Sequence, residues 1–150
     1  MEIFINKRFN GPPNSGNGGY VAGLIAKEIG KCCEVKLVTP PPLEKPLLLK
    51  KSNENYELYD GETLVCIANT TAIDNDPCEF VSFSDALIGS KNGLSKFEPI
   101  HAMPDCFVCG PNRKEGDGLR LFTGPQDLDS NPSEDDLVST TWVPDKGLSS

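Results

Sequence analysis

Apolar and polar positions in the first part of the chain predict one helix set between extended segments. A short extended segment at residues 3–9 gives way to a stretch of glycine, proline and asparagine at 10–19, which interrupts any regular element. Residues 20–29 then carry apolar side chains at helical spacing, and Gly30 is a natural helix end. The expected apolar stripe comprises Val21, Leu24, Ile25 and Ile29.

The residues after Gly30 predict a run of strands. Four segments are rich in β-branched, aromatic or alternating apolar residues, and Asp60-Gly61 between the last two is a strong hairpin signal. The expected strands are 33–38, 47–51, 56–59 and 63–72. One helix followed by consecutive strands is the pattern of an α+β fold with an antiparallel sheet.

The second half of the chain is less regular. Residues 80–88 fit either a short helix or a loop, and we interpret the wider stretch 77–104 as a linker. Two further strands are expected, one in the second half of residues 116–122 and one at 137–143. Between them, the acidic stretch 127–136 is expected to be a loop or disordered.

Charge and composition narrow the classes of partner. The chain has 150 residues and a net charge of −8, which disfavours nucleic acid and anionic membranes as partners. No apolar run approaches the roughly 20 residues of a membrane span. The N-terminus lacks the pattern of a signal peptide, so we expect a cytoplasmic protein with six reduced cysteines. No phosphate-loop or dinucleotide motif is present, and we expect no cofactor.

Two blocks of the sequence resemble a group of thioesterase-like hotdog proteins. The first is residues 8–24, and the second is Cys106-Phe107-Val108-Cys109-Gly110 with the following residues to 120. The second block is also similar to the start of the phenylacetate-type thioesterases. The segments 40–43 and 142–145 fit the first group as well.

This resemblance implies a hotdog fold, in which an antiparallel sheet wraps around one central helix. It implies a first hotdog unit at 1–76 and, after the linker 77–104, the first strands of a second unit at 105–150. The segment that would carry a second helix is missing, so we expect the chain to be a piece of a longer protein. The implied ligand is an acyl-CoA or a carrier-bound acyl thioester, and the implied assembly is a homodimer or a pseudo-dimeric double hotdog.

Asn17, Gly18, Gly19 and Tyr20 at the start of the expected helix are the first candidate site. A helix N-terminus presents unpaired N–H groups and partial positive charge, and glycine admits a ligand close to the backbone. These donors would stabilise the oxyanion formed when water attacks a thioester, with Asn17 orienting the water or the carbonyl. The alternative is that the glycines only form a tight turn and that Asn17 is a helix cap.

Hydrolysis also needs a group that activates water, and Glu28 is the helical candidate. The phenylacetate-type enzymes carry an Asp where this chain has Ala26, so the acid of that family does not map here. Glu28 is otherwise a solvated surface charge. The rival hypothesis is therefore a noncatalytic acyl-binding or scaffold protein that keeps the fold without the chemistry.

Two sites in the second half remain open. Arg113, in a short basic stretch, would meet a CoA phosphate or else be solvated surface. Cys106 and Cys109, with His101 ahead of them, suggest zinc, but a second ligand pair is not evident. We expect these cysteines to be structural thiols and expect no metal.

Overall fold

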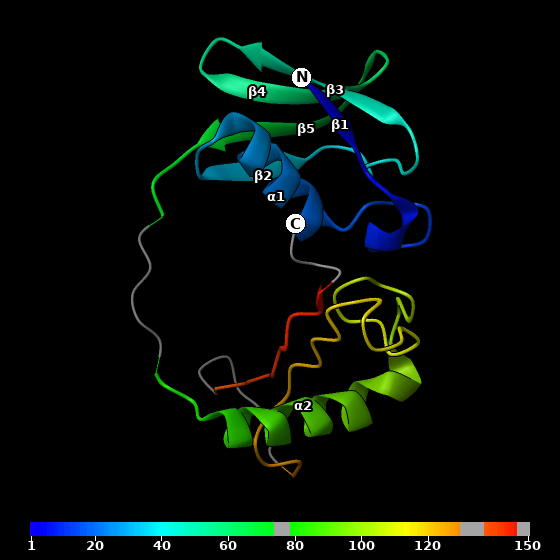
Figure 1. Ribbon diagram of the computed structural model, residues 1–150, viewed down its shortest axis with the longest axis vertical. Helices are drawn as coiled ribbons and strands as arrows, with labels where there is room; N and C mark the ends of the chain where they lie inside the picture. The colour runs from blue at the N-terminus through cyan, green and yellow to red at the C-terminus, as the bar shows by residue number, and fades with distance from the viewer. Residues whose placement is uncertain (74–78, 130–136, 147–150) are drawn as a thin grey trace. The chain divides into compact units, whose positions relative to one another are not determined.

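The alternating segments of the first half form a five-stranded antiparallel sheet with one helix, α1, across its face (Figure 1). The computed structural model describes residues 1–73, 79–129 and 137–146. Residues 74–78, most of the acidic stretch 127–136 and residues 147–150 therefore lie outside the described residues. The chain divides into two units, Met1–Asp76 and Pro77–Ser150, and each is described by itself.

The sheet of the first unit confirms the predicted α+β class. Its strand order is β1-β3-β4-β5-β2, and every neighbouring pair is antiparallel. The strands are β1 (Glu2–Phe4), β2 (Cys33–Leu37), β3 (Pro46–Ser52), β4 (Asn55–Asp60) and β5 (Thr63–Thr70). The expected extended segment at 3–9 ends early, because Lys7–Phe9 forms a short 3-10 helix, η1. The three central strands follow one another in sequence, whereas β1 and β2 close the two edges.

Helix α1 (Gly18–Ile29) begins and ends where its sequence provides caps. The Asn17 side chain accepts a hydrogen bond from the Tyr20 N–H at 3.1 Å, which satisfies one donor of the first turn. Gly30 adopts φ +72°, a left-handed conformation that glycine accepts without a steric penalty. Val21 and Ile25, one turn apart, are fully buried and attach the helix to the core.

Strand β3 shows how the period-two alternation builds the core. Leu47 and Leu49 are 1% and 2% exposed, whereas Leu48 between them is 46% exposed. Leu49 pairs with Leu58 of β4, which is also fully buried. Successive side chains of a strand point to opposite faces, so a run of three leucines contributes two residues to the core and one to the surface.

The turn between β4 and β5 matches the hairpin that the sequence predicts. Asp60 pairs with Thr63, and Gly61 between them has φ +59°. Two-residue hairpin loops favour such positive φ values, because their twist matches that of the flanking strands. The register also shifts between Leu58 and Tyr59, which accommodates an irregularity just before the turn.

The second unit contains helix α2 (Phe83–Phe97) and the short 3-10 helix η2 (Glu98–Ile100), at positions that the sequence suggested as a linker. The face of α2 that packs inward is small and polar. Its buried residues are Ala86, Gly89, Ser90, Asn92 and Gly93. A periodicity of large apolar residues is absent from this face, which is why the sequence left residues 80–88 open between a short helix and a loop and did not predict the full helix.

The prediction of two strands in the second half is wrong for the described residues. Residues 119–122 and 137–143 form no strand, and the only β pairing there is an isolated bridge between Gly124 and Ser139. The N–H groups of Leu119 and Leu121 instead donate to the carbonyls of Phe107 and Val108, each at 2.9 Å. The hydrogen-bonding groups of these extended residues therefore pair with the Cys106–Gly110 turn and with α2, and not with neighbouring strands of a sheet.

Burial raises the pKa of the Cys66 thiol, in the core of the first unit, from 9.0 to about 11. Below about pH 8 the thiol is protonated in both folded and unfolded chains, so it adds no pH dependence. Above that pH only the unfolded chain loses the proton, and we expect about 2 kcal/mol less stability by about pH 10.5.

Urea unfolding at a series of pH values checks this expectation. The Cys66→Ala variant is less stable overall but should lack this part of the alkaline decline. Cys32→Ala removes an exposed thiol beside β2 and should retain the decline. Equal pH slopes in wild type and Cys66→Ala would contradict the assignment.

Candidate functional site

The loop before α1 is held by backbone hydrogen bonds despite its glycines and prolines. Gly11 N–H donates to the Ser15 carbonyl at 2.9 Å, and Asn17 N–H donates to the Phe9 carbonyl at 2.8 Å. Gly16 N–H reaches the Pro41 carbonyl at 2.7 Å, which attaches the loop to the segment after β2. The loop therefore fixes the position of the start of α1. The loop is in turn attached, through the Gly16–Pro41 hydrogen bond, to the segment after β2.

The first turn of α1 presents backbone donors. Asn17 caps the Tyr20 N–H, and the Asn17 carbonyl accepts from Val21 N–H at 2.9 Å. Within the described part of the chain, the N–H groups of Gly18 and Gly19 have no hydrogen-bond partner, as is usual for a first turn. Two donors and the positive end of the helix dipole thus meet at Gly18 and Gly19.

Tyr20 packs beside these donors and does not project into solvent. Its ring stacks on Phe9 with centroids 3.8 Å apart and planes 8° apart. Burial raises the pKa of the Tyr20 hydroxyl, and the nearby positive charge of Arg8 opposes this rise. The Tyr20 hydroxyl therefore stays protonated near neutral pH, and its ring anchors the first turn to η1.

A pocket of about 340 Å³ lies next to this helix end, within the first unit. Gly16 and Gly18 form its helix side, and residues 37–41 form its other side. Leu37 and Val38 contribute apolar surface that is 42% and 50% exposed. A Cβ added to Gly18 would lie 3.2 Å from Leu37 Cδ1, so the glycine keeps this passage open. The pocket thus combines apolar walls with the backbone of Gly18, the first residue of α1.

The lining of this pocket contains no titratable side chain among the described residues. Its polar side chains are the hydroxyls of Ser15 and Thr39, and Thr39 already donates to the Leu64 carbonyl at 3.2 Å. Glu28 is exposed and lies ten residues beyond Gly18 on α1, about 15 Å along the helix axis. The structure brings Asn17, Gly18, Gly19 and Tyr20 together and leaves Glu28 at the opposite end of the helix.

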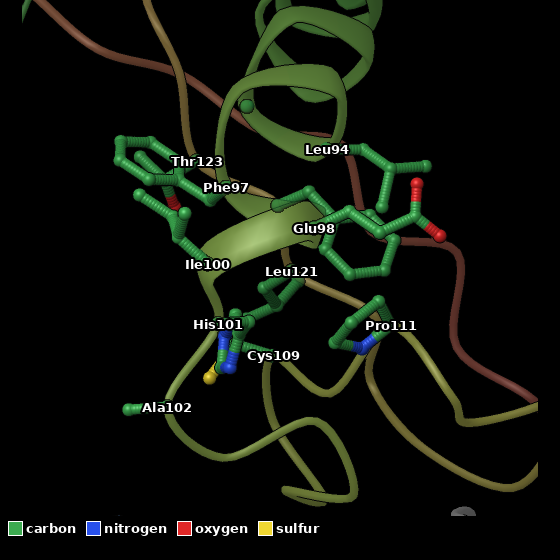
Figure 2. A pocket seen from close by; sticks show the side chains of 12 residues that line it. Leu94, Phe97, Glu98, Ile100, His101, Ala102, Cys109, Pro111, Leu121 and Thr123 are labelled. Carbon is green, nitrogen blue, oxygen red and sulfur yellow. The ribbon is translucent and has the colours of Figure 1, made fainter.

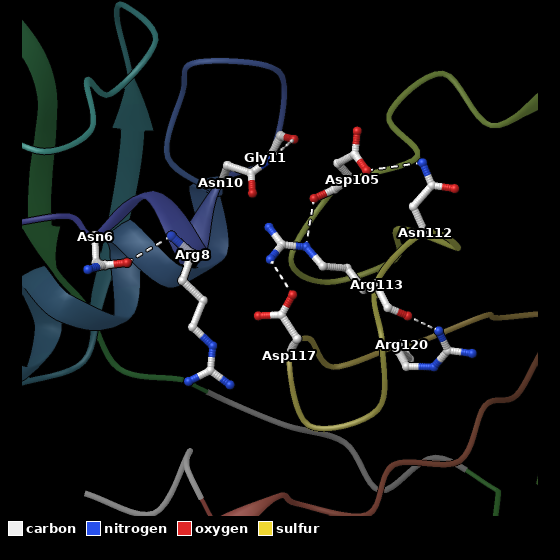
Figure 3. A network of polar contacts seen from close by, with 9 residues as sticks. All are labelled: Asn6, Arg8, Asn10, Gly11, Asp105, Asn112, Arg113, Asp117 and Arg120. Atoms are coloured by element: carbon white, nitrogen blue, oxygen red, sulfur yellow. Dashed lines mark hydrogen bonds and ion pairs between the residues drawn. The ribbon is translucent and has the colours of Figure 1, made fainter.

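Arg113 belongs to the second unit, where acidic and carbonyl groups hold its guanidinium (Figure 3). Its Nε donates to the Asp105 carbonyl at 2.9 Å, and one terminal nitrogen pairs with the Asp117 carboxylate at 3.1 Å. The Arg113 carbonyl in turn accepts from Arg120. The side chain is only 13% exposed, so it braces the loops around it.

The cysteine turn of the second unit brings the Cys106 and Cys109 thiols into hydrogen-bond contact. Burial raises the pKa of the Cys109 thiol to about 11, and a hydrogen bond with Cys106 adds to the rise. Protonated thiols are poor nucleophiles and poor metal ligands. Among residues 1–73, 79–129 and 137–146, no three His, Cys, Asp or Glu side chains gather closely enough to hold a metal ion.

The sequence did not identify the wall formed by residues 37–41. The segment 40–43 supported the sequence resemblance, and no site was expected there, yet the Pro41 carbonyl anchors Gly16 and the preceding residues line the pocket. The available signal was the apolar pair Leu37-Val38 just before the prolines. Leu37 ends β2 and Val38 follows it, and their exposed side chains offer apolar surface that a ligand can contact.

No helix in the described residues has the length and hydropathy needed to cross a lipid bilayer. Comparison of the chain with protein-family models, with curated proteins and with solved structures finds no match. Its function is therefore inferred from its own residues and geometry.

Proposed function

We propose that this chain is a hotdog-type protein that binds an acyl thioester at the N-terminus of α1. The observation that carries the proposal is an apolar-walled pocket lined by Gly18, the first residue of α1, with Gly19 next to it in the uncapped first turn. A thioester combines the two features that such a site recognises. Its carbonyl oxygen accepts hydrogen bonds, and its acyl chain favours contact with Leu37 and Val38.

The architecture of the first unit supports the hotdog assignment. The sequence resemblance implies a strand, a helix and then a run of strands, with the sheet wrapped around the helix. The first unit has this order, with α1 between the two edge strands in sequence and Val21 and Ile25 buried against the sheet. Residues 8–24, which carry the first block of the resemblance, form the loop and the first turns of the helix.

Within this proposal, the residues at the pocket favour binding over hydrolysis. Activation of water needs a base within hydrogen-bond reach of the reacting carbon, directly or through one water. The described lining of the pocket provides none, and Glu28 is about 15 Å away along α1. We therefore assign acyl-CoA or a carrier-bound acyl group as ligand, with hydrolysis as the outcome that would revise the proposal.

The test compares two substitutions of Gly18 that differ in one donor. Proline suits the first position of a helix and removes the N–H, and Asn17 already has the extended conformation that precedes proline. Gly18→Ala keeps the N–H and adds a Cβ near Leu37, as proline also does. We expect Gly18→Pro to bind hexanoyl-CoA about fivefold to tenfold more weakly than Gly18→Ala in calorimetric titrations, because one hydrogen bond is lost.

Two further readouts decide the function class. Free CoA, which has no acyl group, should bind more weakly than hexanoyl-CoA, and thiol release should stay at the background rate. Absence of hexanoyl-CoA binding by the folded wild-type chain would overturn the proposal. Equal affinities of Gly18→Pro and Gly18→Ala would remove the Gly18 N–H from the site, and rapid thiol release would make the protein a hydrolase.

A further inference from the structure

The second unit contains its own pocket, of about 360 Å³, at the C-terminal end of α2 (Figure 2). The last turn of α2, η2, the cysteine turn and residues 121–123 surround it. Most of its lining side chains are hydrocarbon. They include Leu94, Phe97, Ile100, Pro111, Leu121 and Phe122. This volume is at the lower end of the range for small-molecule pockets, about 300–1,000 Å³, so a compact ligand fits it.

His101 gives this apolar pocket a polar group with a defined role. Its Nδ1 accepts a hydrogen bond from the Met103 N–H at 3.1 Å. A nitrogen that accepts carries no proton, so the neutral imidazole bears its proton on Nε2. Within the described residues, Nε2 has no partner of its own. His101 therefore brings one unused hydrogen-bond donor to the pocket wall.

The charge around the pocket selects against anions. The Cys109 thiol remains neutral near pH 7, since its pKa is raised to about 11. Glu98 of η2 contributes an exposed carboxylate to the lining. A negatively charged ligand would meet this like charge, and the described lining contains no lysine or arginine. Arg120 lies outside the lining, with its guanidinium 5.1 Å from the centroid of the Phe122 ring.

We infer that this pocket binds a small, uncharged aromatic molecule that carries a hydrogen-bond acceptor such as a carbonyl. Phe97, Phe122 and the imidazole of His101 offer ring surfaces to an aromatic ligand, and the His101 Nε2–H donates to its acceptor. The residues concerned all belong to the second unit, so the inference does not depend on the proposed acyl-thioester site in the first.

The test uses acetophenone as the probe, with toluene and benzoate as matched comparisons. Toluene lacks the acceptor, and benzoate adds a negative charge. His101 is the sole histidine of the chain, so its imidazole signals in NMR spectra are unambiguous. Acetophenone should shift these signals and the methyl signals of Leu94 and Leu121 saturably. Its affinity should exceed that of toluene by about tenfold, and benzoate should bind more weakly than acetophenone.

Two substitutions separate the contribution of the His101 donor to affinity from that of the apolar pocket. His101→Phe keeps an aromatic ring but removes the donor, so acetophenone should fall to the affinity of toluene. Phe83→Ala removes an exposed side chain of α2 outside the pocket lining and should leave both affinities unchanged. Gly18→Pro should likewise have no effect, which keeps failure of this inference distinct from failure of the acyl-thioester proposal.

Two results would overturn the inference. The first is a folded wild-type chain whose His101, Leu94 and Leu121 signals do not respond to acetophenone. The second is an acetophenone preference over toluene that persists in His101→Phe, because the donor would then lie elsewhere.

Discussion

Leu49→Ala is expected to destabilise the first unit by about 2–5 kcal/mol, a large share of the stability of a small domain. Leu49 is 2% exposed and pairs with the fully buried Leu58 across β3 and β4. Truncation removes its transfer free energy and leaves a cavity that the sheet and α1 fill only in part. Urea unfolding followed by far-ultraviolet circular dichroism measures the change.

The neighbouring residue provides a matched control. Leu48→Ala makes the same chemical change one position away, where the side chain is 46% exposed on the other face of β3. We expect it to cost less than about 1 kcal/mol, because little buried surface is lost. Similar losses for both variants would show that β3 does not bury one face in the register described here.

Gly93→Ala is expected to destabilise the second unit by about 1–3 kcal/mol. A Cβ at this position would lie 2.5 Å from the Phe122 carbonyl oxygen and 2.7 Å from the Thr123 carbonyl carbon. Both are backbone atoms, which cannot rotate aside as the end of a flexible side chain does. The fluorescence of Trp142, the sole tryptophan and a residue of the second unit, reports the unfolding transition.

Gly23→Ala in α1 is the control for helix propensity. A Cβ there meets nothing within 4 Å. Alanine is more favourable than glycine inside a helix by about 0.5–1 kcal/mol, so the substitution should stabilise the first unit by about this amount. The same substitution in two helices is thus expected to act with opposite sign. A stabilising Gly93→Ala would show that α2 does not approach residues 122–123 closely.

The first unit was predictable because its elements follow ordinary periodicities. The stripe through Val21 and Ile25 indicated the helix, and the alternation at 33–38 together with the Asp60-Gly61 hairpin signal indicated the sheet. Strand order was not predictable from these local patterns. Pairing of β1 with β3 and of β2 with β5 depends on contacts between residues far apart in sequence.

The second unit was poorly predictable because its packing uses small and polar groups. Ser90 accepts a hydrogen bond from the Thr141 N–H at 2.7 Å, and the Asn92 amide donates to the carbonyls of Pro125 and Gln126 at 3.0 Å each. Such contacts satisfy polar groups between α2 and extended backbone. They leave no hydrophobic period in the sequence, so residues 80–88 stayed open between a short helix and a loop, the full length of α2 was not predicted, and strands were predicted where none forms.

The residues of the candidate site also fall into two groups, those that local sequence could identify and those that it could not. The cap at Asn17 and the open turn at Gly18 and Gly19 were recognisable, because local sequence determines a helix start. The roles suggested for Glu28 and Arg113 required knowledge of tertiary position. Glu28 lies at the far end of α1, and Arg113 is engaged by Asp105 and Asp117.

The strand order of the first unit also determines when its parts can become stable during synthesis. Strands β3, β4 and β5 are joined by short turns and pair with their neighbours in sequence, so their loop-closure entropy is small. The edge strands β1 and β2 leave the ribosome first, yet their partners are β3 and β5. Nascent β1, α1 and β2 therefore expose their apolar residues until the central meander has emerged, and this interval is when the chain is most open to aggregation or chaperone binding.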